Sequence, residues 1–177
     1  MTSFATRVAR FEPAMYAVLR AAFGIVLFTH GLPKALGASH GSMGDPMAGS
    51  IRLIGEVMGL PFAPQLAFLV MLLETVGAAM LTLGMLTRGV ALLFACEMAG
   101  ISLALGPTWP WIDRGIEYPV LMGFLALYVA ARDGGAYSVD GFQRRPSMRS
   151  ADSVPPPRAA RYSSKPAQER CVGQASG

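Results

Sequence analysis

Four apolar stretches, each containing or adjoining an ionisable side chain, set the strongest limit on what this chain can fold into. They cover about residues 14–32, 66–86, 90–105 and 118–131. A charged side chain at the centre of a membrane-spanning helix costs about 2.5–3.5 kcal/mol on lenient scales. Such residues are tolerated where they face each other or a hydrated cavity. The pattern therefore predicts a polytopic membrane protein with a polar interior.

The overall composition agrees with membrane spans. Of 177 residues, 53% are hydrophobic and 15% are charged, whereas soluble domains average about 25% charged residues. The apolar residues form blocks that are separated by Gly, Pro and charged clusters, which favours spans over a soluble core. At this length we expect one compact domain. The net charge of +4 comes from loops and tails, so it does not indicate nucleic-acid binding.

Arg20 in the first stretch and Glu97 in the third lie at similar predicted depths. A rise of about 1.5 Å per residue places them about 9 and 10 Å inside the same face of the membrane. We expect the two side chains to pair. Alternatively, each could extend its polar end to the nearby membrane surface, which would make its role structural.

A second polar group is expected near the opposite face. Glu74 lies about 12 Å below that face in the second stretch, and His30 lies near the outer end of the first. We expect His30 and Glu74 to pair, with Lys34 and Glu117 closer to the surface. His30 and Glu74 are therefore the candidate catalytic residues, and the candidate substrate-binding residues are Arg20, His30, Lys34, Glu74 and Glu117.

The loop charges predict an orientation. Lys34, Arg52 and Arg114 lie on one side of a four-span protein. The other side carries Arg7, Arg10, Arg88, Arg132, Arg144, Arg145 and Arg149. Because positive loops stay in the cytoplasm, we expect both termini to be cytoplasmic.

The predicted fold is all-α: a four-transmembrane-helix bundle with a short amphipathic helix in the first outer loop. That helix is indicated by apolar residues at helical spacing within 47–58. Residues 1–13 form a cytoplasmic leader, 14–140 the transmembrane domain, and 141–177 a cytoplasmic tail whose Arg, Ser, Pro and Ala content predicts disorder. A cleaved signal peptide ending near residues 35–37 is the alternative for the first stretch, but its length and its two ionisable residues favour a span.

No metal site or intrinsic cofactor is predicted. The chain has two cysteines, Cys96 in the third apolar stretch and Cys171 in the tail, and no CxxC motif. The sequence therefore contains none of the usual cysteine-based signatures of zinc, haem or iron–sulfur sites.

Three segments of the chain contain distinctive short motifs. They are 19–24 (LRAAFG) with 28–34 (FTHGLPK), 72–77 (LLETVG) with 83–88 (LGMLTR), and 117–119 (EYP) with 132–140 (RDGGAYSVD). Their order and spacing over residues 16–140, more than any one motif, resemble the DoxX family of small bacterial membrane proteins. Glu97 and the tail lie outside the family pattern.

The resemblance implies a four-helix inner-membrane protein related to the DoxD subunit of thiosulfate:quinone oxidoreductase. It also implies an association with oxidoreductase complexes that maintain thiol and oxidative-stress balance. We therefore expect an accessory membrane subunit whose polar pocket binds a quinone or a small thiol or sulfur compound. Its expected partners are the lipid bilayer, a soluble oxidoreductase subunit and a second copy of the chain. The alternatives are a small transporter or lipid-handling protein, and a membrane scaffold without catalysis.

Overall fold

The computed structural model describes residues 9–113 and 115–144, and its regular secondary structure is helical. The predicted all-α class is therefore confirmed. The long helices are α2 (Glu12–Leu36), α6 (Thr87–Leu105), α7 (Glu117–Arg132), and one helix made of α4 (Ala63–Leu72), the π-helical turn η2 (Leu73–Gly77) and α5 (Ala78–Leu83).

Within the described residues, three helices are long and apolar enough to cross a membrane: Glu12–Leu36, Ala63–Leu83 and Thr87–Leu105. Helix α7 covers the fourth apolar stretch but has only 16 residues. At about 1.5 Å per residue it is about 24 Å long, somewhat shorter than a hydrocarbon core of about 30 Å. The predicted count of four spans therefore depends on α7.

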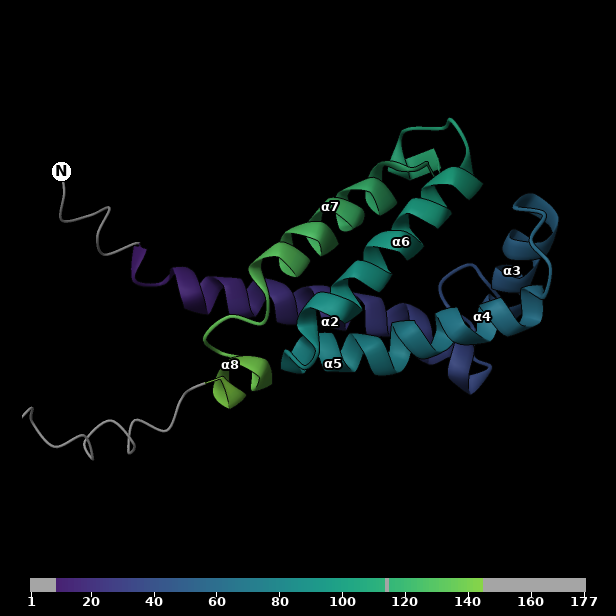
Figure 1. Ribbon diagram of the computed structural model, residues 1–177. Coiled ribbons are helices and arrows are strands. Elements are labelled where there is room, and N and C mark those ends of the chain that lie inside the picture. The colour runs from purple at the N-terminus through teal and green to yellow at the C-terminus, as the bar shows by residue number, and fades with distance from the viewer. Residues whose placement is uncertain (1–8, 114, 145–177) are drawn as a thin grey trace, which may run out of the picture. The chain divides into compact units, whose positions relative to one another are not determined.

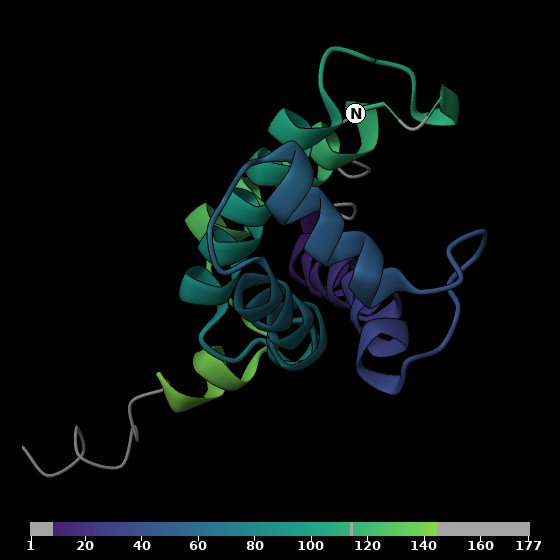
Figure 2. The same ribbon diagram turned by 90° about the vertical axis from the view of Figure 1, so that its right-hand side faces the viewer.

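The helices alternate in direction and pack in two close pairs. Helix α2 lies along η2 and α5, and α6 lies along α7 (Figures 1 and 2). At one end of the bundle, called here the closed end, α2 and α6 begin while α5 and α7 end. At the other, called the cavity end, α2 and α6 end while the α4–α5 helix and α7 begin.

Side-chain burial follows from this packing. The core contains large apolar side chains from α2, α5, α6 and α7: Tyr16, Phe23, Leu27, Leu81, Phe94, Met122 and Val129. Large apolar residues also cover the outward faces, including Val18, Ile25, Leu69, Leu93 and Phe124. A helix that is apolar on all sides is typical of a membrane span, because lipid surrounds its outer face.

At the closed end, the Arg20 guanidinium holds the C-terminal end of α5. Its Nη1 donates to the carbonyl oxygens of Leu81 at 2.6 Å and Thr82 at 3.0 Å. Its Nη2 donates to the carbonyl oxygen of Tyr137 at 2.8 Å. The last carbonyls of a helix have no intrahelical partner. Arg20 therefore satisfies them and ties the segment after α7 to the bundle.

The Asp140 carboxylate performs the matching role at the start of α6. It accepts hydrogen bonds from the backbone N–H of Leu86 (3.0 Å), from the N–H of Thr87 (2.9 Å) and from Thr87 Oγ1 (2.8 Å). Partial burial alone would raise the pKa of Asp140, but these hydrogen bonds and the nearby Arg144 charge outweigh it and hold the pKa below its usual value. Asp140 thus caps a helix that it does not belong to.

Three short segments complete the described chain, one of them the 3₁₀ helix η3 (Trp111–Asp113) before α7. In the first long connection, α3 (Pro46–Arg52) continues into the π-helical turn η1 (Leu53–Val57), where the sequence predicts a helix at 47–58. After α7, helix α8 (Val139–Gln143) extends past the predicted domain boundary at residue 140, and Arg144 pairs with Asp133. The leader up to residue 8 and the tail from residue 145 lie outside the described residues, so the disordered tail stays a prediction.

Candidate functional site

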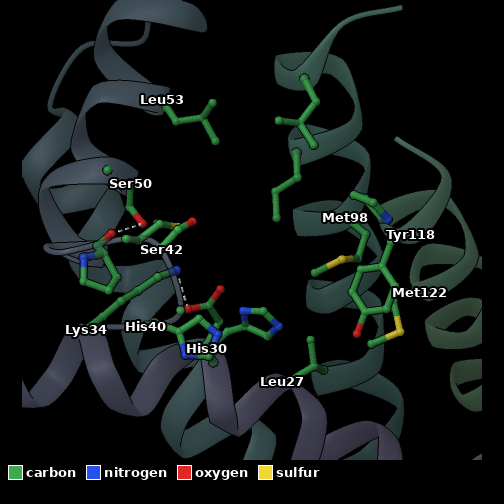
Figure 3. A pocket seen from close by; sticks show the side chains of 18 of the residues that line it. Leu27, His30, Lys34, His40, Ser42, Ser50, Leu53, Met98, Tyr118 and Met122 are labelled. Carbon is green, nitrogen blue, oxygen red and sulfur yellow. Dashed lines mark hydrogen bonds and ion pairs between the residues drawn. The ribbon is translucent and has the colours of Figure 1, made fainter. Parts of the chain in front are cut away.

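A cavity of about 640 Å³ lies at the cavity end of the bundle. Helix α2, the segment 40–53, the turn η2, and helices α6 and α7 surround it (Figure 3). One part of its wall is polar and includes His30, Lys34, His40, Ser42, Ser50 and Glu74, while Tyr118 of α7 lies across the cavity near Met98 and Met122 (Figure 3). The rest is apolar and includes Leu27, Leu53, Met98 and Met122.

The centre of the polar wall is an ion pair between α2 and η2. Lys34 Nζ lies 2.5 Å from Glu74 Oε2, and the two side chains are 11% and 6% exposed. Removing two charges from water is costly unless the partners are close and well oriented. The short distance and the burial together identify the pair as a fixed part of the cavity wall.

The backbone at Glu74 departs from a regular α-helix. The turn η2 (Leu73–Gly77) is π-helical, and Thr75 Oγ1 donates to the carbonyl oxygen of Met71 at 2.7 Å beside it. Single π-helical turns inside α-helices are frequent at functional sites, because they rotate one side chain relative to its neighbours. This turn surrounds the one acidic side chain of the α4–α5 helix.

A glycine lets α2 approach this turn closely. A Cβ atom on Gly31 would lie 2.5 Å from the carbonyl carbon of Glu74 and 2.7 Å from its Cβ. No side chain fits at those distances, so only Gly at position 31 permits the observed contact between α2 and η2. The same contact brings His30 and Lys34, which flank this part of α2, to the Glu74 carboxylate.

Two histidines lie together in the cavity wall. The ring centroids of His30 and His40 are 4.9 Å apart, with the ring planes at 62°. His40 is held by a backbone bridge: its N–H donates to the Met43 carbonyl at 2.9 Å, and the Met43 N–H donates back at 3.0 Å. A neutral imidazole offers one donor and one acceptor, so the pair can donate and accept protons at the cavity surface.

Glu97 of α6 belongs to the same polar group. It lies within electrostatic range of Glu74 and Lys34. Both of its carboxyl oxygens are buried, and neither has a hydrogen-bond partner of normal geometry among the described residues. A buried polar group without a partner is rare in folded proteins and calls for an explanation.

The structure brings together three of the predicted site residues: His30, Lys34 and Glu74 all line the cavity. Arg20 lies at the closed end instead, on backbone carbonyls. Glu117 is exposed at the start of α7, where its neighbours Tyr118 and Pro119 line the cavity.

The predicted pairing of Arg20 with Glu97 is wrong. Arg20 binds the carbonyl oxygens of Leu81, Thr82 and Tyr137, while Glu97 lies beside Glu74. Depth along a helix is only one coordinate, and the direction in which a side chain points around the helix axis determines its neighbours.

His40 is a cavity residue that the sequence reasoning did not identify. It lies in an irregular loop, ten residues after His30, with no motif around it. Only the fold of the segment 40–53 places it against His30. The sequence signal for Glu97 was its position in an apolar stretch, which predicted a polar interior but the wrong partner.

Comparison with known proteins assigns this sequence to a family. The DoxX family profile matches residues 15–106. Over 125 residues the chain is 27% identical to the "Putative oxidoreductase CatD" of Bacillus subtilis (strain 168), an alignment that covers 71% of this chain and 84% of that protein. No solved structure matches significantly. The profile match and the apolar helices together confirm the resemblance seen in the sequence: the chain belongs to the DoxX family of membrane proteins.

Proposed function

We propose that this protein is a membrane subunit of an oxidoreductase module and binds the head group of a quinone in the cavity between α2, α6 and α7. A small thiol or sulfur compound is the other ligand class that the family suggests. The protein would supply the binding site and the protons, while a soluble oxidoreductase partner would supply the electrons.

One observation carries this proposal: the buried Lys34–Glu74 pair and the two histidines line one side of a cavity whose other walls are mostly apolar. Its volume of about 640 Å³ falls within the range of about 300–1,000 Å³ usual for small-molecule sites. A quinone combines an apolar ring and tail with carbonyl oxygens that accept hydrogen bonds. Its chemistry therefore matches a wall of methionine and leucine side chains that ends in polar donors.

The side chains of the cavity suit the proton chemistry of quinone reduction. Lys34 Nζ and an imidazole N–H of His30 are donors for the two carbonyl oxygens. Reduction to the quinol takes two electrons from the partner and two protons from groups at the site, one for each oxygen. General acids positioned within hydrogen-bond reach typically contribute 10²- to 10⁴-fold to such transfers.

The proposed topology has four spans, with the closed end in the cytoplasm. Arg88 and Arg132 lie at that end, and Arg52 lies in the connection at the cavity end. The positive-inside rule therefore supports cytoplasmic termini in a bacterial inner membrane. Helix α7 would be the fourth span, with its slightly short apolar length matched by local thinning of the bilayer.

The test is the thermal stability of the detergent-purified protein with ubiquinone and menaquinone analogues of short tail length. A ligand at free concentration L that binds the folded state stabilises it by RT ln(1 + L/Kd), so we expect the unfolding temperature of the wild type to rise with quinone concentration. His30→Ala and Lys34→Met should reduce that rise. Arg52→Met serves as the control, because its side chain is 76% exposed at a surface ion pair.

Four outcomes contradict the proposal. No rise for any quinone would leave the thiol or sulfur ligand class, tested in the same assay with thiosulfate and small thiols. A rise that persists in both cavity variants would place the quinone elsewhere. Accumulation of a solute in proteoliposomes without quinone binding would indicate a transporter, while wild-type behaviour of the cavity variants in every assay would indicate a scaffold.

A further inference from the structure

We propose that Glu74 and Glu97 form a proton-binding site, in which Glu97 stores one proton and passes it to the Glu74 carboxylate. The existence of this site is independent of the ligand. Only the delivery of the proton to a quinone rests on the proposed function. Glu97 lies outside the residues that carry the family resemblance, so the inference concerns this chain.

The charges of the group determine where the proton lies. The Lys34 ammonium and the Glu74 carboxylate, 2.5 Å apart, already neutralise each other. A second carboxylate at Glu97 would add a negative charge that no cation other than Lys34 compensates among the described residues, with both of its oxygens withdrawn from solvent. An uncompensated buried charge is strongly unfavourable, and the group takes up a proton instead.

The lack of hydrogen-bond partners for the Glu97 oxygens also indicates that Glu97 carries a proton. Two carboxylates side by side repel each other, whereas a protonated carboxyl can donate its O–H to a neighbouring carboxylate. The described acidic neighbour of Glu97 is Glu74. A proton on Glu97 turns one of its two buried oxygens into a donor, and the Glu74 carboxylate is the neighbouring acceptor.

The surrounding ionisable groups come from four elements. Lys34 and His30 approach from α2, Glu74 from η2, His40 from the segment 40–53, and Tyr118 from α7. Among them, Lys34 pairs with Glu74. The two histidines line the cavity on the Glu74 side, so protons can reach the carboxyl pair through them.

The proposed transfer is a proton exchange without redox change. The O–H bond of Glu97 breaks, an O–H bond forms on Glu74, and the negative charge moves from Glu74 to Glu97. If a quinone is reduced in the cavity, this proton is one of the two that its oxygens require. A proton taken up from the cavity then restores Glu97.

Infrared spectroscopy of the purified protein, with Glu97→Gln, Glu74→Gln and the double variant, tests the site without any quinone. A protonated buried carboxyl gives a C=O absorption that shifts in D₂O and is separate from carboxylate bands. We expect this absorption near neutral pH in the wild type and its loss in Glu97→Gln. Glu56→Gln is the matched control, because Glu56 is exposed in the ion pair with Arg52.

Stability gives the second readout. Glu97→Gln replaces a neutral group by a neutral group of the same shape, so the unfolding temperature should change little. In Glu74→Gln, Glu97 can release its proton and become the counterion of Lys34. Its carboxyl absorption should then disappear, and only part of the stability should be lost. The double variant leaves Lys34 without any counterion, so its loss should exceed the sum of the two single losses.

An unchanged absorption in Glu97→Gln, its absence from the wild type, or additive losses in the double variant would each overturn the inference. These results do not depend on quinone binding. If the carboxyl band is assigned to Glu97 but no quinone stabilises the protein, the proton site is supported and only the proposed ligand is rejected.

Discussion

Lys34 Nζ lies 2.5 Å from Glu74 Oε2, although the two residues are 40 positions apart and both side chains are almost fully buried. This ion pair joins α2 to the π-helical turn of the next long helix. It is at once a structural link between two helices and the polar centre of the cavity. Substitution of either residue should therefore affect both the stability of the protein and its ligand binding.

We expect Lys34→Met to destabilise the folded protein by about 3–5 kcal/mol, the range found when one partner of a buried ion pair is removed. The unfolding midpoint in detergent measures this effect. Arg52→Met should change the midpoint by no more than about 0.5 kcal/mol, because exposed ion pairs contribute little. Equal losses in the two variants would show that the Lys34–Glu74 pair is not a buried link.

Gly31→Ala tests the close contact between α2 and η2. The new methyl group would lie 2.5 Å from the Glu74 carbonyl carbon, so the helices must separate at a cost of about 1–3 kcal/mol. We also expect weaker stabilisation by quinone, because the shift displaces His30 and Lys34 from Glu74. Both effects can be measured in the same thermal assay.

Gly89→Ala is the matched control. A Cβ atom at Gly89 in α6 meets nothing within 4 Å, and alanine favours helix over glycine by about 0.5–1 kcal/mol. This variant should be as stable as the wild type or slightly more stable. A comparable loss in both glycine variants would refute the packing role of Gly31.

Arg20→Met should lower the unfolding temperature while retaining quinone-induced stabilisation. Arg20 donates to three backbone carbonyls at the closed end, and hydrogen bonds from a charged group contribute about 1.5–3 kcal/mol each. Because Arg20 is not among the cavity residues, quinone should still raise the unfolding temperature of the variant. Loss of this quinone-induced rise would indicate that Arg20 contributes to the ligand site, as the sequence analysis predicts.

Asp140→Asn should alter the acid sensitivity of the protein. The folded state holds the pKa of Asp140 below its usual value. The stabilisation is therefore complete above the unfolded pKa of about 3.9 and is lost as pH falls through the lower folded value. The variant should therefore lack this part of the loss of stability at acid pH. At neutral pH it should be about 1 kcal/mol less stable than the wild type, as is usual when a helix cap is removed.

Thermal midpoints between pH 3 and pH 7 measure this difference. Asp113→Asn is the control, because Asp113 is exposed in the loop before α7. If Asp140→Asn follows the wild-type pH profile and Asp113→Asn does not, the capping role assigned to Asp140 is incorrect.

The apolar stretches by themselves determined the helices and the presence of a polar interior. Long runs of apolar residues favour helix in a membrane, because the backbone must satisfy its own hydrogen bonds there. Ionisable residues within those runs are expected to face each other or a hydrated cavity. The sequence therefore predicts that His30 and Glu74 pair, with Lys34 closer to the surface, whereas in the structure Glu74 pairs with Lys34.

The tertiary structure alone decided which polar groups meet. The rise per residue gives the depth of Arg20 and Glu97, but it does not give the direction of their side chains around the helix axes. The π-helical turn at Glu74, the contact at Gly31 and the folding of the segment 40–53 over the helices depend on packing between distant parts of the chain. These features place Arg20 on the carbonyls of the closed end, Glu97 beside Glu74, and His40 against His30.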